Sequence, residues 1–459
     1  MQRFGIPGVG LSLIDGGKVV FEGGLGVKAL GQSDPVDANT LFLAASNTKA
    51  MTTLLLAELV DEGKLRWNEP VIEAFPGFKL GDAETTRQVQ VQHLVCACTG
   101  LPRQDLEWLF NYASATPASA LALLGTMQPT SRFGEVFQYS NLMAAAAGYV
   151  AAARLHPGQE LGAAYDEAMR TKVFEPLGMT RTTFDFAAAM RGDYASPHGI
   201  DVDGRTVPGR MDSNYSVVPV RPAGGMWTSA HDLARYLEME LRQGVLQDGS
   251  RLVTTENLLE RRRAQIASGY GESYGMGLVV NTQRGIPIIS HGGVLMGYRS
   301  QMMFLPEHGV GAVVLTNSDS GGYLTGLLYR RLLEVLFDGR PEAAERAEAA
   351  ATRRAADIAK ERQRLVIPPD AAETGKLASR YANPVLGELR VLAREGETVF
   401  DFGAWHSAVA SRHNDDGTTS FITTDPTIAR WRFVVAERDG SRALIVRDAQ
   451  HEYAFVEVR

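Results

Sequence analysis

The chain has 459 residues, which is too many for one ordinary hydrophobic core, so we expect two or more domains. Apolar residues make up 45% and charged residues 22%, the balance of a soluble globular protein. The formal net charge of −7 argues against a nucleic acid or an anionic membrane surface as the main partner. No run approaches the roughly 18 consecutive apolar residues that a membrane-spanning helix needs.

The first predicted elements are two strands near the N-terminus. Residues 8–14 are apolar but lack the basic segment and cleavage site of a secretory signal. We therefore predict a strand that turns at residues 15–17 into a second strand over residues 18–21. A domain that begins on a strand at residue 8 is compatible with a targeting segment upstream of this chain. Both the cytoplasm and the periplasm stay open as the compartment of a soluble protein.

Residues 1–335 combine strand signals at both ends with helical patterns in between. Further strand candidates lie at residues 275–281, 288–291, 300–305 and 310–316, whereas residues 46–265 are mainly helix and loop. A sheet assembled from both ends of a domain, with helices between them in the sequence, is an α+β arrangement. We predict one α+β catalytic domain over residues 1–335.

The rest of the chain divides into a connector and a second, β-rich domain. Residues 336–374 form the connector, with an exposed helix predicted over residues 341–364 and ended by Pro368-Pro369. Residues 375–459 contain short strand-like runs separated by turn signals, a spacing that predicts a small antiparallel barrel or sandwich. The runs lie at residues 388–392, 399–402, 420–424, 431–436, 443–447 and 453–458.

A serine and a lysine lie three residues apart at the start of a predicted helix. Ser46 and Lys49 precede an apolar stripe that ends at Gly63, so both side chains are expected on one face, one turn apart. A serine hydroxyl becomes nucleophilic when a neighbouring base removes its proton, and a lysine can be that base when burial lowers its pKa. A helix cap with a solvent-exposed lysine fits the same residues, so the pair alone is a weak signal.

Two further motifs follow along the chain. Tyr139-x-Asn141 precedes a helix of small residues; a tyrosine can pass a proton, and an asparagine amide can orient a lysine or hold a carbonyl. His291-Gly292-Gly293 ends a predicted strand, where two glycines allow close approach to the backbone and the histidine is a titratable donor. Taken separately, a helix cap and a structural histidine are the better explanations of these residues.

In order and separation the three motifs resemble those of the penicillin-recognising serine hydrolases: class C β-lactamases, DD-peptidases, related esterases and D-aminopeptidases. The resemblance covers about residues 5–335 and implies a β-lactamase/DD-peptidase-like antiparallel sheet with a helical domain. The C-terminal strand spacing is similar to that of the small lipocalin-like barrels attached to some peptidases of this group. Flanking segments that extend the likeness are Gly5-Ile6-Pro7-Gly8, His93-Leu94, Thr99-Gly100-Leu101-Pro102, Pro222-Ala223-Gly224-Gly225 and Gly297-Tyr298-Arg299-Ser300.

The resemblance also implies roles for individual residues. Ser46 attacks the substrate carbonyl, and Lys49 and Tyr139 share the proton transfer, with the general base open between them. The backbone N–H groups of Ser46 and Val294 form the oxyanion hole. Substrate-binding roles fall to Asn141, His291, Gly293 and Val294.

The sequence departs from the family pattern in its third motif. His291 stands where β-lactamases and transpeptidases carry the lysine that holds a substrate carboxylate. This departure favours the peptidases, D-aminopeptidases and esterases of the group over its β-lactamases.

Several other patterns are set aside. Ser273 lies in a Gly-x-Ser-x-Gly pattern, but the elbow of α/β-hydrolases needs a strand before it and a helix after it. Cys96 and Cys98 are expected to be buried thiols, because a bridge between such close neighbours is strained. No metal-ligand spacing or phosphate loop is present, so we expect no metal and no cofactor. Aromatic candidates for pocket walls or core packing are Trp108, Phe110, Tyr112, Tyr270 and Tyr274.

The sequence therefore predicts a metal-independent serine hydrolase that forms an acyl-enzyme at Ser46, most simply a peptidase or amidase. The alternatives are a carboxylesterase on the same scaffold, and a weak β-lactamase or penicillin-binding protein. The expected partner is a small molecule or short peptide, with no nucleic acid and no membrane. The C-terminal domain is a candidate surface for homo-oligomer formation.

Overall fold

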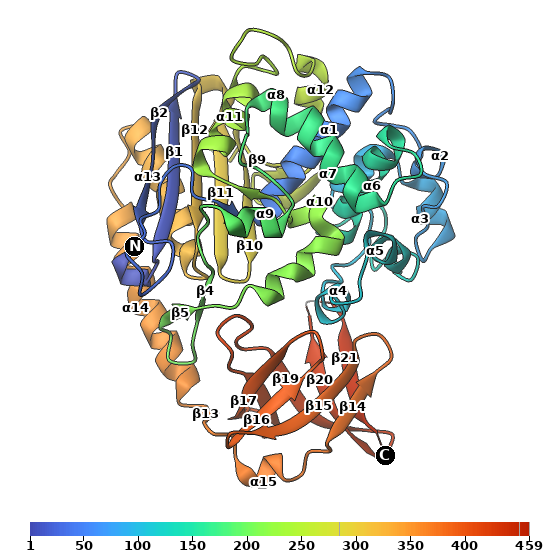
Figure 1. The fold of residues 1–459 in the computed structure, drawn as a ribbon, viewed down its shortest axis with the longest axis vertical. Helices are drawn as coiled ribbons and strands as arrows, with labels where there is room; N and C mark the ends of the chain where they lie inside the picture. Colours follow the sequence, from blue (N-terminus) through green and yellow to red (C-terminus); the bar gives the residue numbers. More distant parts are fainter. Residues whose placement is uncertain (284, 449, 459) are drawn as a thin grey trace.

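The computed structural model describes residues 1–283, 285–448 and 450–458, which form two β-sheet structures stacked one above the other (Figure 1). The upper sheet has eight strands in the order β2-β1-β12-β11-β10-β9-β8-β7. The N-terminal strand β1 pairs antiparallel with β12, with Val9 opposite Thr316, so the prediction of a sheet built from both ends of the domain is confirmed. The strands are β1 Gly8–Asp15, β2 Lys18–Gly26, β7 Ile266–Gly269, β8 Glu272–Tyr274, β9 Val279–Asn281, β10 Ile288–Leu295, β11 Tyr298–Leu305 and β12 Val310–Thr316.

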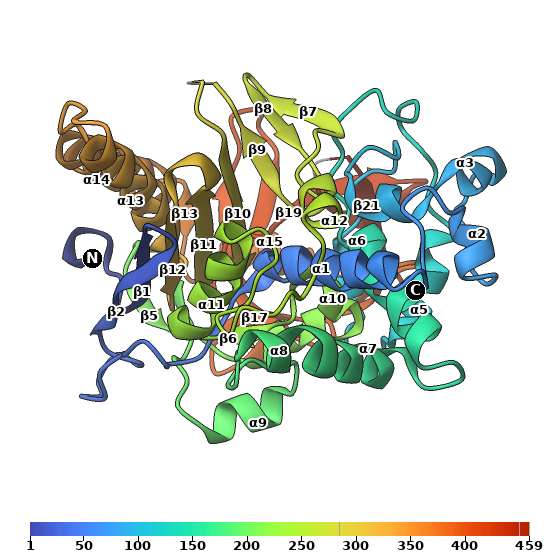
Figure 2. The same ribbon diagram turned by 90° about the horizontal axis from the view of Figure 1, so that it is seen from above.

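Helices cover both faces of this sheet (Figure 2). Alternate residues of a strand point to opposite faces. Met302 and Phe304 therefore join the main core with helix α11, whereas Met303 and Leu305 pack with helix α13 on the other face. The helices of three turns or more are α1 Thr48–Asp61, α6 Asn141–Leu155, α11 Ala230–Leu241, α13 Gly321–Leu336 and α14 Ala343–Arg362.

Shorter elements complete the helical side of the domain. Its remaining α-helices are α2 Val71–Ala74, α3 Ala83–Gln88, α4 Leu106–Phe110, α5 Pro117–Leu124, α7 Leu161–Met169, α8 Glu175–Leu177, α9 Phe186–Arg191, α10 Arg221–Gly224 and α12 Thr255–Glu260, whereas α15 Ala371–Thr374 lies next to the barrel (Figure 1). Two small ribbons pair β3 Phe42–Leu43 with β6 Trp227–Thr228, and β4 His198–Ile200 with β5 Thr206–Pro208. In the described part of the chain, no helix is both long enough and apolar enough to cross a bilayer.

The C-terminal strands form a closed eight-stranded antiparallel barrel, with β17 pairing to β18 to close it. A short strand, β13 Leu365–Val366, adds to the outside of β17. The prediction of a small barrel is confirmed, but two of its strands were not predicted. Strand β14 is only four residues long, and β17 consists mostly of small and polar residues, so neither has a long apolar run. The barrel strands are β14 Arg380–Asn383, β15 Gly387–Arg394, β16 Glu397–Asp401, β17 His406–His413, β18 Thr419–Thr423, β19 Arg432–Arg438, β20 Ser441–Arg447 and β21 Glu452–Glu457.

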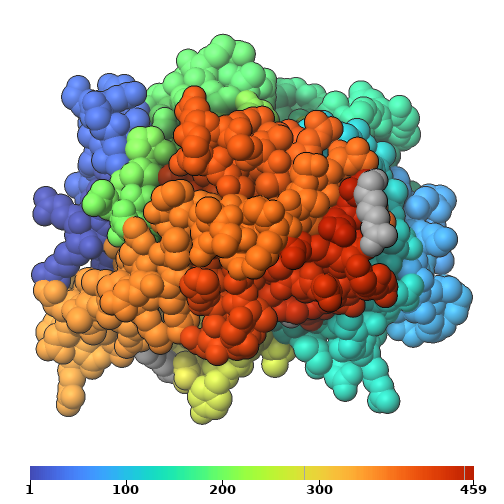
Figure 3. Space-filling model, turned by 90° about the horizontal axis from the view of Figure 1, so that it is seen from below, coloured from blue at the N-terminus to red at the C-terminus, as the bar shows by residue number. Residues whose placement is uncertain are grey.

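The barrel spreads over the lower face of the α+β domain (Figure 3), and helix α4 of that domain inserts into its core. Phe110 is 1% exposed, with ring centroids 5.0 Å from Phe402, 5.1 Å from Trp405 and 5.9 Å from Phe455. Packed aromatic rings at these separations attract one another beyond their simple burial. The barrel interior is therefore partly filled by a side chain from the other domain.

Candidate active site

Ser46 lies on a short 3₁₀ turn that runs directly into helix α1. The residue before it, Ala45, has a φ of +48°, in the left-handed region that residues other than glycine rarely adopt. Two buried hydrogen bonds hold the turn: Ser300 Oγ donates to the Ala44 carbonyl at 2.7 Å, and Asn47 Nδ2 donates to Ser300 Oγ at 2.7 Å. Such backbone strain persists only where surrounding contacts over-determine the conformation. Strand β11 thus fixes the turn that carries Ser46.

Strand β10 packs so closely against this turn that position 293 requires glycine. A Cβ atom on Gly293 would lie 2.2 Å from the Ala44 carbonyl oxygen and 2.2 Å from Ser300 Oγ. Atoms that are not bonded cannot approach this closely, so any side chain here would displace the turn. The second glycine of the third motif thus accommodates the chain's own backbone beside Ser46.

Lys49 is only 2% exposed, and its amine is surrounded by polar atoms. Nζ lies 3.2 Å from Ser46 Oγ, 2.7 Å from Asn141 Oδ1 and 2.7 Å from the Ala223 carbonyl oxygen. Burial holds the pKa of Lys49 well below its ordinary value. Because the oxygens of Asn141 and Ala223 only accept, a neutral amine gives its two N–H groups to them and turns its lone pair toward Ser46.

Tyr139, Tyr274 and His291 form a polar chain beside Ser46, in which Tyr274 and His291 are buried and Tyr139 is half-buried. The Tyr139 hydroxyl lies within hydrogen-bonding reach of Ser46 and Tyr274, and burial raises the pKa of Tyr139, so the phenol keeps its proton. His291 Nε2 lies 2.9 Å from the Tyr274 hydroxyl, and His291 Nδ1 lies 2.7 Å from the Gly292 carbonyl oxygen. A carbonyl only accepts, so Nδ1 carries the ring proton and Nε2 accepts from Tyr274.

His291 is uncharged at neutral pH in this setting. Burial, followed by repulsion from the protonated form of Lys49, lowers the pKa of His291 to about 3. Both ring nitrogens already have partners within the protein. The histidine therefore does not replace the cation that a lysine would provide at this position.

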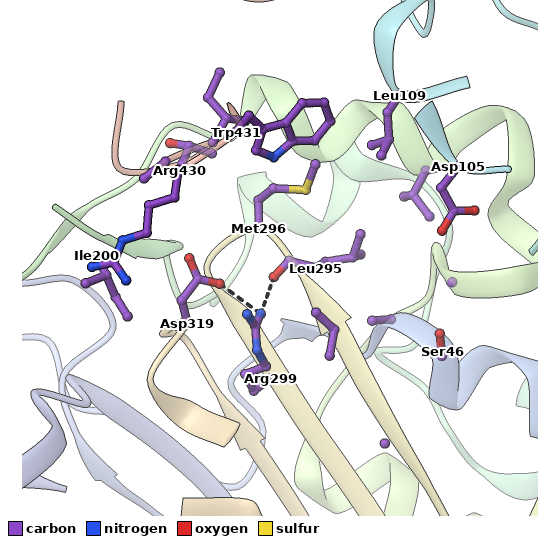
Figure 4. A pocket seen from close by; sticks show the side chains of 18 of the residues that line it. Ser46, Asp105, Leu109, Ile200, Leu295, Met296, Arg299, Asp319, Arg430 and Trp431 are labelled. Carbon is purple, nitrogen blue, oxygen red and sulfur yellow. Dashed lines mark hydrogen bonds and ion pairs between the residues drawn. The ribbon is translucent and has the colours of Figure 1, made fainter. Parts of the chain in front are cut away.

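Ser46 faces a cavity of about 1170 Å³ between the α+β domain and the barrel. Its walls come from the α4 region, the turn between β10 and β11, helix α14 and the barrel loop between β18 and β19. The Val294 side chain lines it and is 65% exposed. In Figure 4, Ser46 and Asp105 lie on one side of the cavity, and Arg299, Asp319 and Arg430 lie on the other. The barrel thus forms part of the wall of the cavity that Ser46 faces.

The structure brings together all the residues that the motifs predicted, from three separate segments. Ser46 and Lys49 lie where the 3₁₀ turn runs into α1, Tyr139 and Asn141 lie at the start of α6, and His291, Gly293 and Val294 lie on β10. The Pro222-Ala223-Gly224-Gly225 segment, noted only for its resemblance, supplies the Ala223 carbonyl that Lys49 binds.

Two residues of the site were missed or only weakly indicated. Asp105 belongs to no motif, yet Asn141 Nδ2 lies 3.1 Å from each of its carboxylate oxygens. Tyr274 was one of several aromatic candidates; of the others, Trp108 lines the cavity, whereas Tyr270 is 88% exposed. The only sequence signal for Asp105 is its position three residues after Pro102, at the end of a flanking segment of the resemblance.

The structure also describes two sequence patterns outside the motifs, the Gly-x-Ser-x-Gly pattern and the pair of cysteines. Ser273 lies on β8 with its hydroxyl 3.5 Å from the Val280 carbonyl oxygen, and strand β9 follows it, so the context of a nucleophile elbow is absent. Cys96 and Cys98 are buried as predicted, but they form a disulfide, which the sequence analysis argued against. Ala97 between them has a φ of +55°, and its left-handed conformation accompanies a Cα–Cα separation of 5.2 Å.

Comparison with known proteins gives this site a family context. The beta-lactamase family model matches residues 1–336. The chain belongs to the beta-lactamase family. Among curated relatives of this family, penicillin-binding protein 4 of Amycolatopsis lactamdurans is 26% identical over 340 residues, covering 72% of this chain and 85% of the relative. Unguisins hydrolase ungD' of Aspergillus campestris is 24% identical over 421 residues, covering 85% of this chain and 76% of the relative.

Two solved structures share the fold of this chain. An octameric penicillin-binding protein homologue from Pyrococcus abyssi aligns over 99% of this chain and 96% of its own, with a TM-score of 0.63 and 22% identity. A class C beta-lactamase from Rhodobacter sphaeroides aligns over 78% of this chain and 95% of its own, with a TM-score of 0.56 and 19% identity. The first alignment covers the barrel as well as the α+β domain.

A substitution at Gly293 tests how β10 supports the turn that carries Ser46. We expect Gly293→Ala to displace the Ser46 turn and to slow labelling by a fluorophosphonate, a reagent for activated serines, on the order of 10²-fold, the effect of a misplaced reacting group. The matched control is Gly292→Ala, because a Cβ there meets only the mobile end of Gln301 and should leave labelling near the wild-type rate. Equal labelling of wild type and Gly293→Ala would contradict this role.

Proposed function

We propose that this member of the beta-lactamase family is a serine hydrolase that forms an acyl-enzyme at Ser46 and cleaves an amide bond in a short peptide or aminoacyl amide. The observation that carries the proposal is the Lys49 amine, which is buried, bonded to two acceptor oxygens and 3.2 Å from Ser46 Oγ. A buried neutral amine beside a serine hydroxyl is the pairing that nucleophilic catalysis needs.

The pKa values of Lys49 and Tyr139 shift in opposite directions, and this difference supports separate proton-transfer roles for the two residues. Burial lowers the pKa of Lys49, which favours the neutral base, and raises the pKa of Tyr139, which favours the protonated phenol. We therefore assign Lys49 as the general base and Tyr139 as the group that relays a proton to the leaving atom. Asn141 holds Lys49 by its side-chain oxygen.

The proposed acylation begins with attack of Ser46 Oγ on the substrate carbonyl carbon while Lys49 Nζ takes the hydroxyl proton. The backbone N–H groups of Ser46 and Val294 receive the negative charge on the carbonyl oxygen. The C–N bond then breaks, and Tyr139 gives its proton to the leaving nitrogen while it takes one from Lys49. Water adds to the acyl carbonyl with Lys49 again as base, and release of the carboxylic acid returns the proton to Ser46.

The preference for a peptide or aminoacyl amide over a penicillin rests on His291. A neutral histidine with both nitrogens engaged gives no positive charge to the carboxylate of a penicillin. The relative named as unguisins hydrolase aligns over 85% of this chain, which supports hydrolysis as the reaction. A carboxylesterase on the same scaffold remains the second candidate, because ester and amide hydrolysis share the same acyl-enzyme.

Assembly of this chain with copies of itself is part of the proposal. The octameric homologue from Pyrococcus abyssi aligns over 99% of the chain, including the barrel, which supports a homo-oligomer. Sedimentation equilibrium distinguishes such an assembly from a monomer.

The location of the nucleophile can be tested by covalent labelling. We expect a fluorophosphonate to label the wild-type protein and Ser273→Ala at equal rates, whereas Ser46→Ala should take up no label. Ser273 is the matched control because it lies in a serine-hydrolase-like pattern but on a strand outside the proposed site. Labelling of Ser46→Ala together with loss of labelling in Ser273→Ala would contradict the proposal.

The substrate class can be tested with a panel of compounds. We expect turnover of short peptides or D- or L-aminoacyl amides and little or no cleavage of nitrocefin, a chromogenic β-lactam, because His291 is uncharged. Steady-state rates on these amides, on p-nitrophenyl esters and on nitrocefin separate the candidates. Cleavage of esters without cleavage of any amide would establish the carboxylesterase instead.

A further inference from the structure

Asp105 determines which way the amide of Asn141 points. Asn141 Nδ2 lies 3.1 Å from both oxygens of Asp105, while Asn141 Oδ1 lies 2.7 Å from Lys49 Nζ. A carboxylate only accepts hydrogen bonds and a lysine amine donates its N–H groups, so the amide nitrogen must face Asp105 and the amide oxygen must face Lys49. A flipped amide would place oxygen against carboxylate and nitrogen against amine.

The Asp105 carboxylate is itself held in place within its own segment. Its side chain is 13% exposed. Trp108 Nε1 donates to Asp105 Oδ1 at 3.1 Å, and the Arg103 guanidinium forms an ion pair with Asp105 Oδ2. Asp105 therefore keeps its orientation only as long as residues 103–110 keep theirs.

The barrel holds this segment. Phe110 is buried among the aromatic side chains of the barrel core, as described above. Four further hydrogen bonds cross from the segment and its next two residues to the barrel. They run from Arg103 N to Gln450 Oε1 at 3.0 Å, from Tyr453 Oη to Glu107 Oε1 at 3.3 Å, from Asn111 Nδ2 to the Val385 carbonyl at 2.9 Å and from Tyr112 Oη to the Ala404 carbonyl at 2.8 Å.

We propose that Asp105 is a positioning residue of the active site, and that the barrel sets its position by holding Phe110 of helix α4. The chain of contacts runs from the barrel core through Phe110 and α4 to Asp105, then to Asn141 and Lys49. The inference rests on the proposed function, in which Lys49 is the base. It makes the barrel a working part of the catalytic site rather than an appendage to it.

A negative charge at Asp105 also acts on Lys49 through space. Burial is the largest influence and lowers the pKa of Lys49, whereas the Asp105 charge raises it and the Arg103 charge lowers it. Lys49 must be neutral to act as a base, so the labelling rate falls as pH drops below the Lys49 pKa. Removal of the Asp105 charge lowers this pKa further and moves the acidic limb of the pH profile to lower pH.

The first test uses two substitutions at Asp105 and measures the rate of fluorophosphonate labelling from about pH 5 to pH 10. Asp105→Ala loses both the acceptor and the charge, so we expect the plateau rate to fall on the order of 10- to 10²-fold and the acidic limb to move to lower pH. Asp105→Asn keeps an acceptor oxygen but carries no charge. Its plateau rate should therefore lie between those of Asp105→Ala and the wild type, while the acidic limb of its pH profile should stay at the lower pH. A merely structural role would lower the rate without moving the limb.

The second test addresses the barrel. We expect Phe110→Ala to lower the plateau rate as Asp105→Ala does, and Phe110→Leu to restore most of it. The matched control is Phe421→Ala, a fully buried barrel residue whose ring contacts Phe400, which should lower the melting temperature without changing the labelling rate. Equal losses in Phe421→Ala and Phe110→Ala would overturn the role of the barrel.

The outcomes separate this inference from the proposed function. Wild-type labelling at Ser46, with an unchanged rate and an unchanged pH limb in both Asp105 variants, would overturn the inference alone. If the wild-type protein took up no label, the proposed function itself would fail.

Discussion

The site depends on keeping the Lys49 amine neutral beside Ser46. Burying a charged amine without a counter-charge costs free energy, so burial at this position lowers the pKa of Lys49. Two acceptor oxygens from different parts of the chain, on Asn141 and Ala223, satisfy the N–H groups of the neutral form and direct its lone pair. Helix α1 carries Lys49, and α6 and α10 supply the two oxygens, so three helices of the domain meet at this group.

The fold could be predicted from the sequence where strands carry apolar residues. The two ends of the α+β domain are recognisable as strands because β1 and β12 are almost continuously apolar or small, and because β11 ends in the apolar run of residues 302–305. Pairing of these strands gives the predicted sheet. The polar strand β17 has no long apolar run that would indicate a strand, because several of its buried positions are serine or alanine. It is recognised only from its pairing with the neighbouring strands. The insertion of Phe110 into the barrel was also beyond prediction, because a single aromatic residue does not indicate which core it joins.

The residues of the candidate site were predictable as short ordered patterns, but the residues that support them were not. Asp105 has no neighbours in sequence that share its role, and its contact with Asn141 arises only when α4 and α6 come together. The disulfide of Cys96 and Cys98 depends on the left-handed conformation of Ala97, which the amino-acid type does not indicate. Local sequence patterns therefore identify the motif residues of the candidate site, but they do not identify residues whose role depends on backbone conformation or on contacts between distant segments.

The most direct test of this account is the pKa of Lys49 itself, measured by NMR titration of the folded protein labelled with ¹³C and ¹⁵N in its lysine side chains, with Lys49→Arg to assign the signal. The account predicts a Lys49 signal that titrates well below the ordinary lysine value, with the neutral amine present at the pH at which Ser46 reacts. A Lys49 signal that titrates at the ordinary value, with the amine charged throughout the active pH range, would contradict it.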